Sequence, residues 1–351
     1  MAISFRSAAT ANTGNSTATS ITISKPAGVV AGDLLVALLT VARGTDLAIA
    51  APSGWTLILR TNESTNIATA SYYKVAGASE PTSYQWGFTG TGSPFGAAGG
   101  ISAYVGVHNV SPINASAGQV NASASTSVVT PAVTTTVADA LVIRAHGVRV
   151  GSATPATVTP PTGTSERWEV SNSSNSISRT AETADVVQAA AGGTGTATAT
   201  ADVSVTNASQ TIALTPADTT PPGAPTNLAA TPGFGEISLG WSPNPETDLS
   251  HYNVYRATAS GGPYSKINAS NVTTTSYTDT GATDPATRYY YVVRAVDTSG
   301  NESANSNETS AQPNPTVSPP RVTSIPRVFE PTIEQPFEVS RLRPDAILAK
   351  L

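Results

Sequence analysis

The sequence predicts an all-β protein, and three observations lead to that prediction. Short apolar and β-branched runs, such as Ser20–Ser24 and Leu34–Ala42, alternate with clusters of proline, glycine, asparagine and serine. No window of about twelve residues before the C-terminus has the period of an amphipathic helix. Hydrophobic residues make up 39% of the chain but charged residues only 12%, which suits sheets with an uncharged polar surface.

Residues 1–217 are expected to form a large, jelly-roll-like β-sandwich with an internal repeat. The first copy covers about residues 20–107 and the second about residues 126–215. In each copy an apolar strand leads to a turn and then to a strand that carries a tryptophan, Trp55 in the first and Trp168 in the second. Since no proline-rich hinge joins the copies, we expect one double-sheet domain rather than two separate ones.

A change in amino-acid composition at Asp218 marks a domain boundary. The segment 218–225, DTTPPGAP, contains three prolines in eight residues, so it is expected to be a stiff, extended linker. The following residues, 222–312, resemble a fibronectin type III domain. The resemblance rests on PTNL, ISLGW, HYNVYR, SYTD and RYYYVVRAVD, followed by SGNES, in that order along the chain.

The resemblance implies a two-sheet module that acts as a spacer or adhesion unit without activity of its own. Period-2 alternation places one set of its side chains between the sheets. We expect Tyr290, Val292 and Arg294 to face outward instead. The predicted core residues of the module are Trp241, Val254, Tyr289, Tyr291, Val293 and Ala295.

The last residues, 313–351, are expected to form an extended arm that a partner holds in place. The segment is rich in proline at its start, and residues 344–351 could form a short helix with Pro344 in its first turn. Its apolar side chains are too few to fold alone, so they would anchor the arm to a neighbouring subunit. These anchoring residues are Phe329, Phe337, Leu342, Ile347, Leu348 and Leu351.

Composition excludes several classes of function. The net charge of −5 offers no basic surface for nucleic acid, and the longest apolar run is about half of a membrane-spanning helix. With no cysteine, disulfides, thiolate metal sites and a cysteine nucleophile are excluded. The first twenty residues lack the basic and apolar regions of a secretory signal, so none is expected.

No catalytic motif is recognisable, and we predict no enzymatic activity, no cofactor and no metal site. His146 is expected to be an ordinary strand residue. The carboxylate pairs Glu166/Glu169 and Glu182/Asp185 could act as acid and base only if the fold converged them. A second set of polar loop residues could bind calcium but is better explained by turn capping: Asp46, Asp279, Asp297 and Asn301.

An aromatic row is the strongest candidate for a binding surface. Period 2 places Tyr84, Trp86 and Phe88 on one face of a strand. If exposed, the rings could stack on the faces of sugars. Because aromatic residues are only 6% of the chain, the same row could instead be sheet core.

The GDLLVALL, PSGWT and ASYYKVAG segments resemble β-sandwich domains of phage tail-associated and actinobacterial surface proteins. This resemblance implies a non-enzymatic bacteriophage virion protein on the particle exterior, either a minor tail protein or a capsid decoration protein. Its partners would be other virion proteins, held through the arm, and host surface polysaccharide. We expect a homo-oligomer or multi-copy assembly, which raises avidity. The alternative is a secreted bacterial carbohydrate-binding or adhesion protein.

Overall fold

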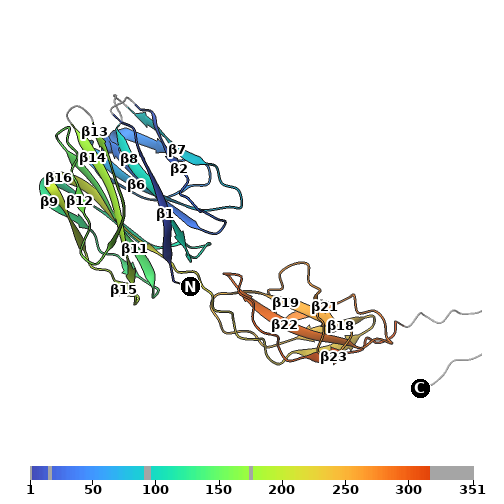
Figure 1. Cartoon of the computed structure of the whole chain (residues 1–351). Helices are drawn as coiled ribbons and strands as arrows, with labels where there is room; N and C mark the ends of the chain where they lie inside the picture. Colours follow the sequence, from blue (N-terminus) through green and yellow to red (C-terminus); the bar gives the residue numbers. More distant parts are fainter. Residues whose placement is uncertain (1, 15–17, 91–95, 174–176, 317–351) are drawn as a thin grey trace, which may run out of the picture.

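A computed structural model describes residues 2–14, 18–90, 96–173 and 177–316 of the chain. These residues confirm the all-β prediction, since they form 23 strands and one short 3-10 helix, Gly44–Asp46. Figure 1 shows two bodies, a larger one containing β1 to β16 and a smaller, elongated one containing β17 to β23. No helix among the described residues has the length and apolar character to cross a bilayer.

The first half of the larger body contains two sheets. Its three-stranded sheet has the order β2 (Ser20–Ser24), β7 (Ser83–Gly90) and β4 (Leu47–Ala50). The strands of its five-stranded sheet are, in sheet order, β1 (Ser4–Asn12), β8 (Ala97–Val105), β3 (Leu34–Ala42), β6 (Ile67–Val75) and β5 (Thr56–Glu63). The continuous apolar run in β3 is buried at every position because other sheets cover both faces of this central strand.

The second half repeats this strand order. In its large sheet, β16 pairs with β9 along one edge and with β11 and the short strand β12 along the other. In sheet order its strands are β9 (Ile113–Thr130), β16 (Ala197–Leu214), β11 (Ala140–Val150), β14 (Ser178–Gln188) and β13 (Ser165–Ser173). The order matches β1-β8-β3-β6-β5 strand for strand. This match supports our proposal that residues 1–217 contain an internal duplication.

Three short strands complete the second half. They are β12 (Val158–Thr159) and the pair β10 (Thr134–Thr135) and β15 (Gly192–Gly193).

The five-stranded sheet of the first half packs against the six-stranded sheet of the second. Leu34, Val36 and Tyr104 of the first sheet contact Leu141 and Ile143 of the second. This contact buries apolar surface from both halves, so it stabilises them as one body.

Trp168 lies in the same interface. Its indole Nε1–H donates a hydrogen bond to Ser102 Oγ at 2.9 Å. Gly100 makes room for the ring, because a Cβ there would lie 2.7 Å from ring atoms. Trp55, its expected counterpart, packs instead between the two sheets of the first half.

The smaller body is a sandwich of two sheets. The strands of one are β17 (Ala229–Gly233), β18 (Glu236–Gly240) and β21 (Ser276–Asp279), and those of the other are β20 (Ser265–Lys266), β19 (Leu249–Ala257), β22 (Tyr289–Asp297) and β23 (Thr309–Ala311). Between them lies one core that contains the expected side chains, Trp241, Val254, Tyr289, Tyr291, Val293 and Ala295.

One outward position differs from expectation. Tyr290 and Arg294 are partly exposed, but Val292 is 2% exposed and is therefore buried. At the far end the module continues to Asn314, whose backbone N–H donates to Gly233 O at 2.8 Å. Residues 317–351 lie outside the described residues, and with them the predicted helix 344–351 and the predicted anchors from Phe329 to Leu351.

Candidate functional site

The aromatic row is core and not a binding platform. Tyr84, Trp86 and Phe88 are 3%, 0% and 3% exposed. Trp86 makes an edge-to-face contact with Trp55, at 5.1 Å between ring centroids, beneath the three-stranded sheet. No ring face is left for a sugar, so the structure contradicts the interpretation of this row as a glycan-stacking surface.

A different aromatic residue lies at the surface, in a groove of about 380 Å³ next to β5. Tyr73 of β6 lines this groove; it is half-buried and packs partly against the core between the two large sheets. Leu57, 51% exposed, and Val110, 72% exposed, are its apolar walls. The remaining lining is small and uncharged: Thr56, Ile58, Ser111, Pro112, Ile113 and Ser116. A partly apolar concavity with a few hydroxyl groups can hold an uncharged, hydroxyl-rich ligand.

A histidine positions one wall of this groove. His108 Nδ1 accepts hydrogen bonds from the backbone N–H groups of Val110, at 3.2 Å, and Ser111, at 3.0 Å. Because Nδ1 accepts both, the imidazole hydrogen lies on Nε2, which contacts Ser299 Oγ of the smaller body at 3.1 Å. The groove wall is thereby connected to the junction of the two bodies.

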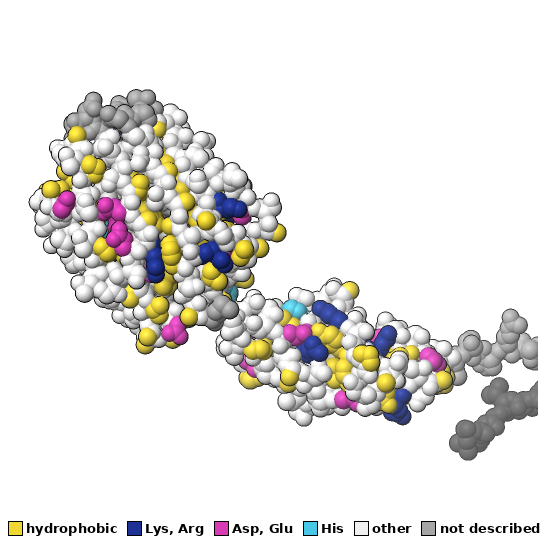
Figure 2. Space-filling model, in the orientation of Figure 1, with side chains coloured by type: hydrophobic (Ala, Val, Ile, Leu, Met, Phe, Trp, Pro, Cys, Tyr) yellow, Lys and Arg dark blue, Asp and Glu magenta, His cyan; other side chains and the backbone are white. Residues whose placement is uncertain are grey.

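The residues that line the groove carry no charge. On the face of the molecule drawn in Figure 2, uncharged polar side chains and backbone cover most of the surface, and Lys, Arg, Asp and Glu are scattered over it. Such a surface suits a neutral ligand better than a charged one.

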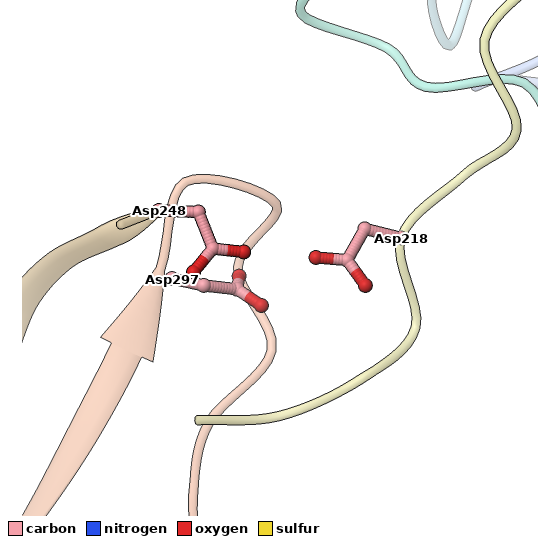
Figure 3. A group of neighbouring side chains, drawn as sticks. All are labelled: Asp218, Asp248 and Asp297. Atoms are coloured by element: carbon pink, nitrogen blue, oxygen red, sulfur yellow. The ribbon is translucent and has the colours of Figure 1, made fainter. Parts of the chain in front are cut away.

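Three carboxylates meet at the junction of the bodies (Figure 3). Asp218 comes from the linker, Asp248 precedes β19 and Asp297 ends β22, and one oxygen of each lies within 4.8 Å of the others. Oxygen ligands of this kind can hold calcium. Asp297 is already satisfied, since it accepts hydrogen bonds from the backbone N–H groups of Ser299 and Asn301 and from the Asn301 side chain. Turn capping therefore explains Asp297, and the absence of a metal stays a prediction.

Of the carboxylates named from the sequence, Glu166 is exposed, and Glu169 lies opposite Glu182 in the β13–β14 register, where it accepts a hydrogen bond from the backbone N–H of Val158. Glu182 forms a buried pair with His146 Nδ1, and both side chains are 0% exposed. Asp185 binds Arg167 and accepts a hydrogen bond from Tyr104. Burial raises the pKa of Glu182, while the hydrogen bond to His146 opposes that rise. Glu182 and Asp185 are buried and closed to substrate, so they are structural in this fold.

Comparison with known proteins identifies the smaller body. No family model matches the chain. The chain is 45% identical over 96 residues to the amylopullulanase of Thermoanaerobacterium saccharolyticum, a stretch that covers 27% of this chain and 7% of that protein. It is 44% identical over 108 residues to exoglucanase B of Cellulomonas fimi, covering 30% of this chain and 9% of the exoglucanase. The chain therefore spans less than a tenth of the length of these relatives.

A solved structure agrees with these matches. The chain is 42% identical to an Fn3-like protein from Clostridium thermocellum, over 27% of this chain and 96% of that one, with a TM-score of 0.24. Together with the sequence motifs and the two-sheet core, these matches confirm that the smaller body is a fibronectin type III module.

The comparisons contradict the prediction of a bacteriophage virion protein. The curated relatives are named amylopullulanase and exoglucanase B, and these matches do not support the phage resemblance assigned to the N-terminal segments. The predicted capsid or tail partners and the virion location lose their support for the same reason.

Proposed function

We propose that this chain is a non-catalytic extracellular protein that binds carbohydrate. Its type III module is similar to parts of an amylopullulanase and an exoglucanase, two enzymes named for the polysaccharides they degrade. In this proposal the larger body holds the glycan, and the type III module acts as a spacer. A multi-copy arrangement, expected from the sequence, would raise avidity for a polymeric ligand.

The observation that carries the proposal is the groove at Tyr73. The exposed part of a half-buried tyrosine in an uncharged concavity can contact the apolar face of a sugar, and the neighbouring hydroxyls can hydrogen-bond to it. The Tyr73 hydroxyl makes no hydrogen bond within the described part of the chain, so it is available to a ligand. Since Leu57 and Val110 are exposed without a ligand, covering them would contribute to binding.

Calorimetric titration of the full chain with maltohexaose and with cellohexaose tests the proposal. We expect binding of at least one of the two, and Tyr73→Ala should weaken it by roughly tenfold or more, since aromatic contacts dominate such sites. Tyr290→Ala, which removes a partly exposed ring from the type III module, is the matched control and should leave the affinity unchanged. Equal affinity of the wild type and Tyr73→Ala would exclude this groove, and binding of neither sugar would count against the function itself.

A further inference from the structure

The second half of the larger body has a pocket of its own, of about 290 Å³. Leu141 and Ile143 of β11 face the first half, so Val142 and Arg144 point to the opposite side of the sheet. There they line the pocket. The rim comes from the turn 161–164, the end of β14 and residues 194–197.

Arg144 is a buried cation without a counter-charge. Arg144 is only 3% exposed, yet no carboxylate among the described residues lies within ion-pair distance of its guanidinium. Its two terminal nitrogens donate to neutral oxygens alone, and Nε has no partner. The acceptors are Thr130 Oγ1, Thr211 Oγ1, Pro131 O, Thr194 O and Gly195 O, at 3.0–3.3 Å.

An uncompensated buried charge is costly, so the site favours an anion that approaches it. Burial disfavours the charged form of the guanidinium and therefore lowers the pKa of Arg144. No acidic residue lines the pocket to repel an anion. The exposed rim carries Thr162 and Thr196, with the Gln188 amide beside them, groups that hydrogen-bond readily to hydroxyls.

We propose that this pocket binds the carboxylate-bearing sugar of an acidic polysaccharide, a uronic acid, with Arg144 supplying the positive charge and the threonine rim contacting the ring hydroxyls. The proposal rests on the proposed carbohydrate-binding function and narrows it. The groove at Tyr73 would take neutral sugar and the pocket at Arg144 would take the acidic one, so one chain would engage a polymer that contains both.

The test is a calorimetric titration of the full chain with trigalacturonic acid, run in parallel with the titrations with maltohexaose and cellohexaose. Gln188→Glu is the principal variant, because a carboxylate on the lining of the pocket would repel an anionic ligand without opening the core. We expect Gln188→Glu to weaken uronate binding at least about tenfold and to leave neutral-sugar binding unchanged. Gln85→Glu, the same charge change at an exposed position of β7, should have no effect on either.

Arg144→Met should also abolish uronate binding, provided that its circular dichroism spectrum matches the wild type. Binding of the neutral sugars but not of trigalacturonic acid would overturn this inference and leave the proposed function standing. Equal binding of trigalacturonic acid by Gln188→Glu and the wild type would overturn it too. Competition by sodium acetate as strong as that by trigalacturonic acid, at equal carboxylate concentration, would overturn the assignment to a sugar.

Discussion

The two halves of the larger body have the same strand order, but the interior of the first is aromatic and that of the second is aliphatic and polar. In the first half, the space between the sheets is filled by Trp55, Tyr72, Tyr84, Trp86 and Phe88. In the second half, no aromatic residue takes part in the corresponding clusters, which are built from valine and alanine. The same side of that sheet holds the Glu182–His146 pair and Arg144.

The difference teaches that one sheet topology can be stabilised in two ways. Aromatic burial stabilises the first half in proportion to the apolar area removed from water. Hydrogen bonds between buried polar groups hold the second half, where each bond adds little but breaking one leaves a costly unpaired group. The polar interior of the second half supplies hydrogen-bond acceptors to the buried Arg144 beside the pocket. A purely aromatic interior would offer such a charge no acceptors.

The largest effect is expected from the aromatic interior. Trp86→Ala removes a fully buried ring that contacts Trp55 and Tyr72, and it should lower the free energy of unfolding of the larger body by about 3–5 kcal/mol. Urea denaturation followed by circular dichroism measures this loss. Trp241→Ala is the control, since it should destabilise the type III module and leave the larger body unchanged. A loss under about 1 kcal/mol for Trp86→Ala would show that the aromatic interior is not the main support of the first half.

The polar interior should respond differently to single and double changes. His146→Leu leaves Glu182 buried without its partner and should cost about 3 kcal/mol, whereas His146→Leu with Glu182→Met should recover most of that loss. Urea denaturation of the wild type, both single variants and the double variant gives the coupling energy. Additive losses would contradict the pairing.

The penalty for His146→Leu should also depend on pH. Burial raises the pKa of Glu182, so the folded state holds this proton more tightly than the unfolded state does. The stability due to this group is therefore greatest in acid and is lost as the pH rises above 4.5, the ordinary value for glutamate. His146 opposes this rise, so without it the pKa of Glu182 lies higher still, and the variant loses more stability than the wild type as the pH rises. We therefore expect the penalty to grow between pH 4.5 and neutrality, and a constant penalty would contradict this account.

Much of the fold follows from the sequence, because alternation and turn residues act locally. The run Leu34–Ala42 forms one buried strand with the expected bounds, and the type III core contains every side chain expected there. The aromatic row shows the limit of this reasoning. Period 2 places Tyr84, Trp86 and Phe88 on one face but cannot show whether another sheet covers that face.

Neither candidate site could be found in this way, because each is assembled from distant segments. The Tyr73 groove brings strands β5 and β6 beside residues 110–116, and the Arg144 pocket joins three separate loops and strands. The tryptophans of the two copies show a further limit. Both strands have an irregularity at the corresponding place, between Leu57 and Leu59 in β5 and between Glu166 and Trp168 in β13. Trp55 precedes this irregularity and Trp168 follows it, so the two tryptophans occupy non-equivalent positions and face different layers despite similar flanking sequences.

The smallest effect is expected in the type III module. Burial alone would raise the pKa of Glu302, but hydrogen bonds from Asn253, Tyr255 and Arg294 outweigh it and lower the pKa. The stability from this carboxylate is present above its ordinary value of 4.5 and is lost as the pH falls below it. Glu302→Gln should therefore lower stability by about 1 kcal/mol at pH 7 and by less in acid, measured by thermal unfolding. A larger loss in acid than at pH 7 would contradict this assignment.

Hydrogen exchange of the full chain, with and without a saturating neutral oligosaccharide, tests the central claim most directly. If the larger body binds carbohydrate through the Tyr73 groove, amides in residues 56–58 and 110–116 should exchange more slowly with maltohexaose or cellohexaose present, and those of the type III module should not change. Slower exchange confined to the type III module, or no change anywhere, would contradict the account.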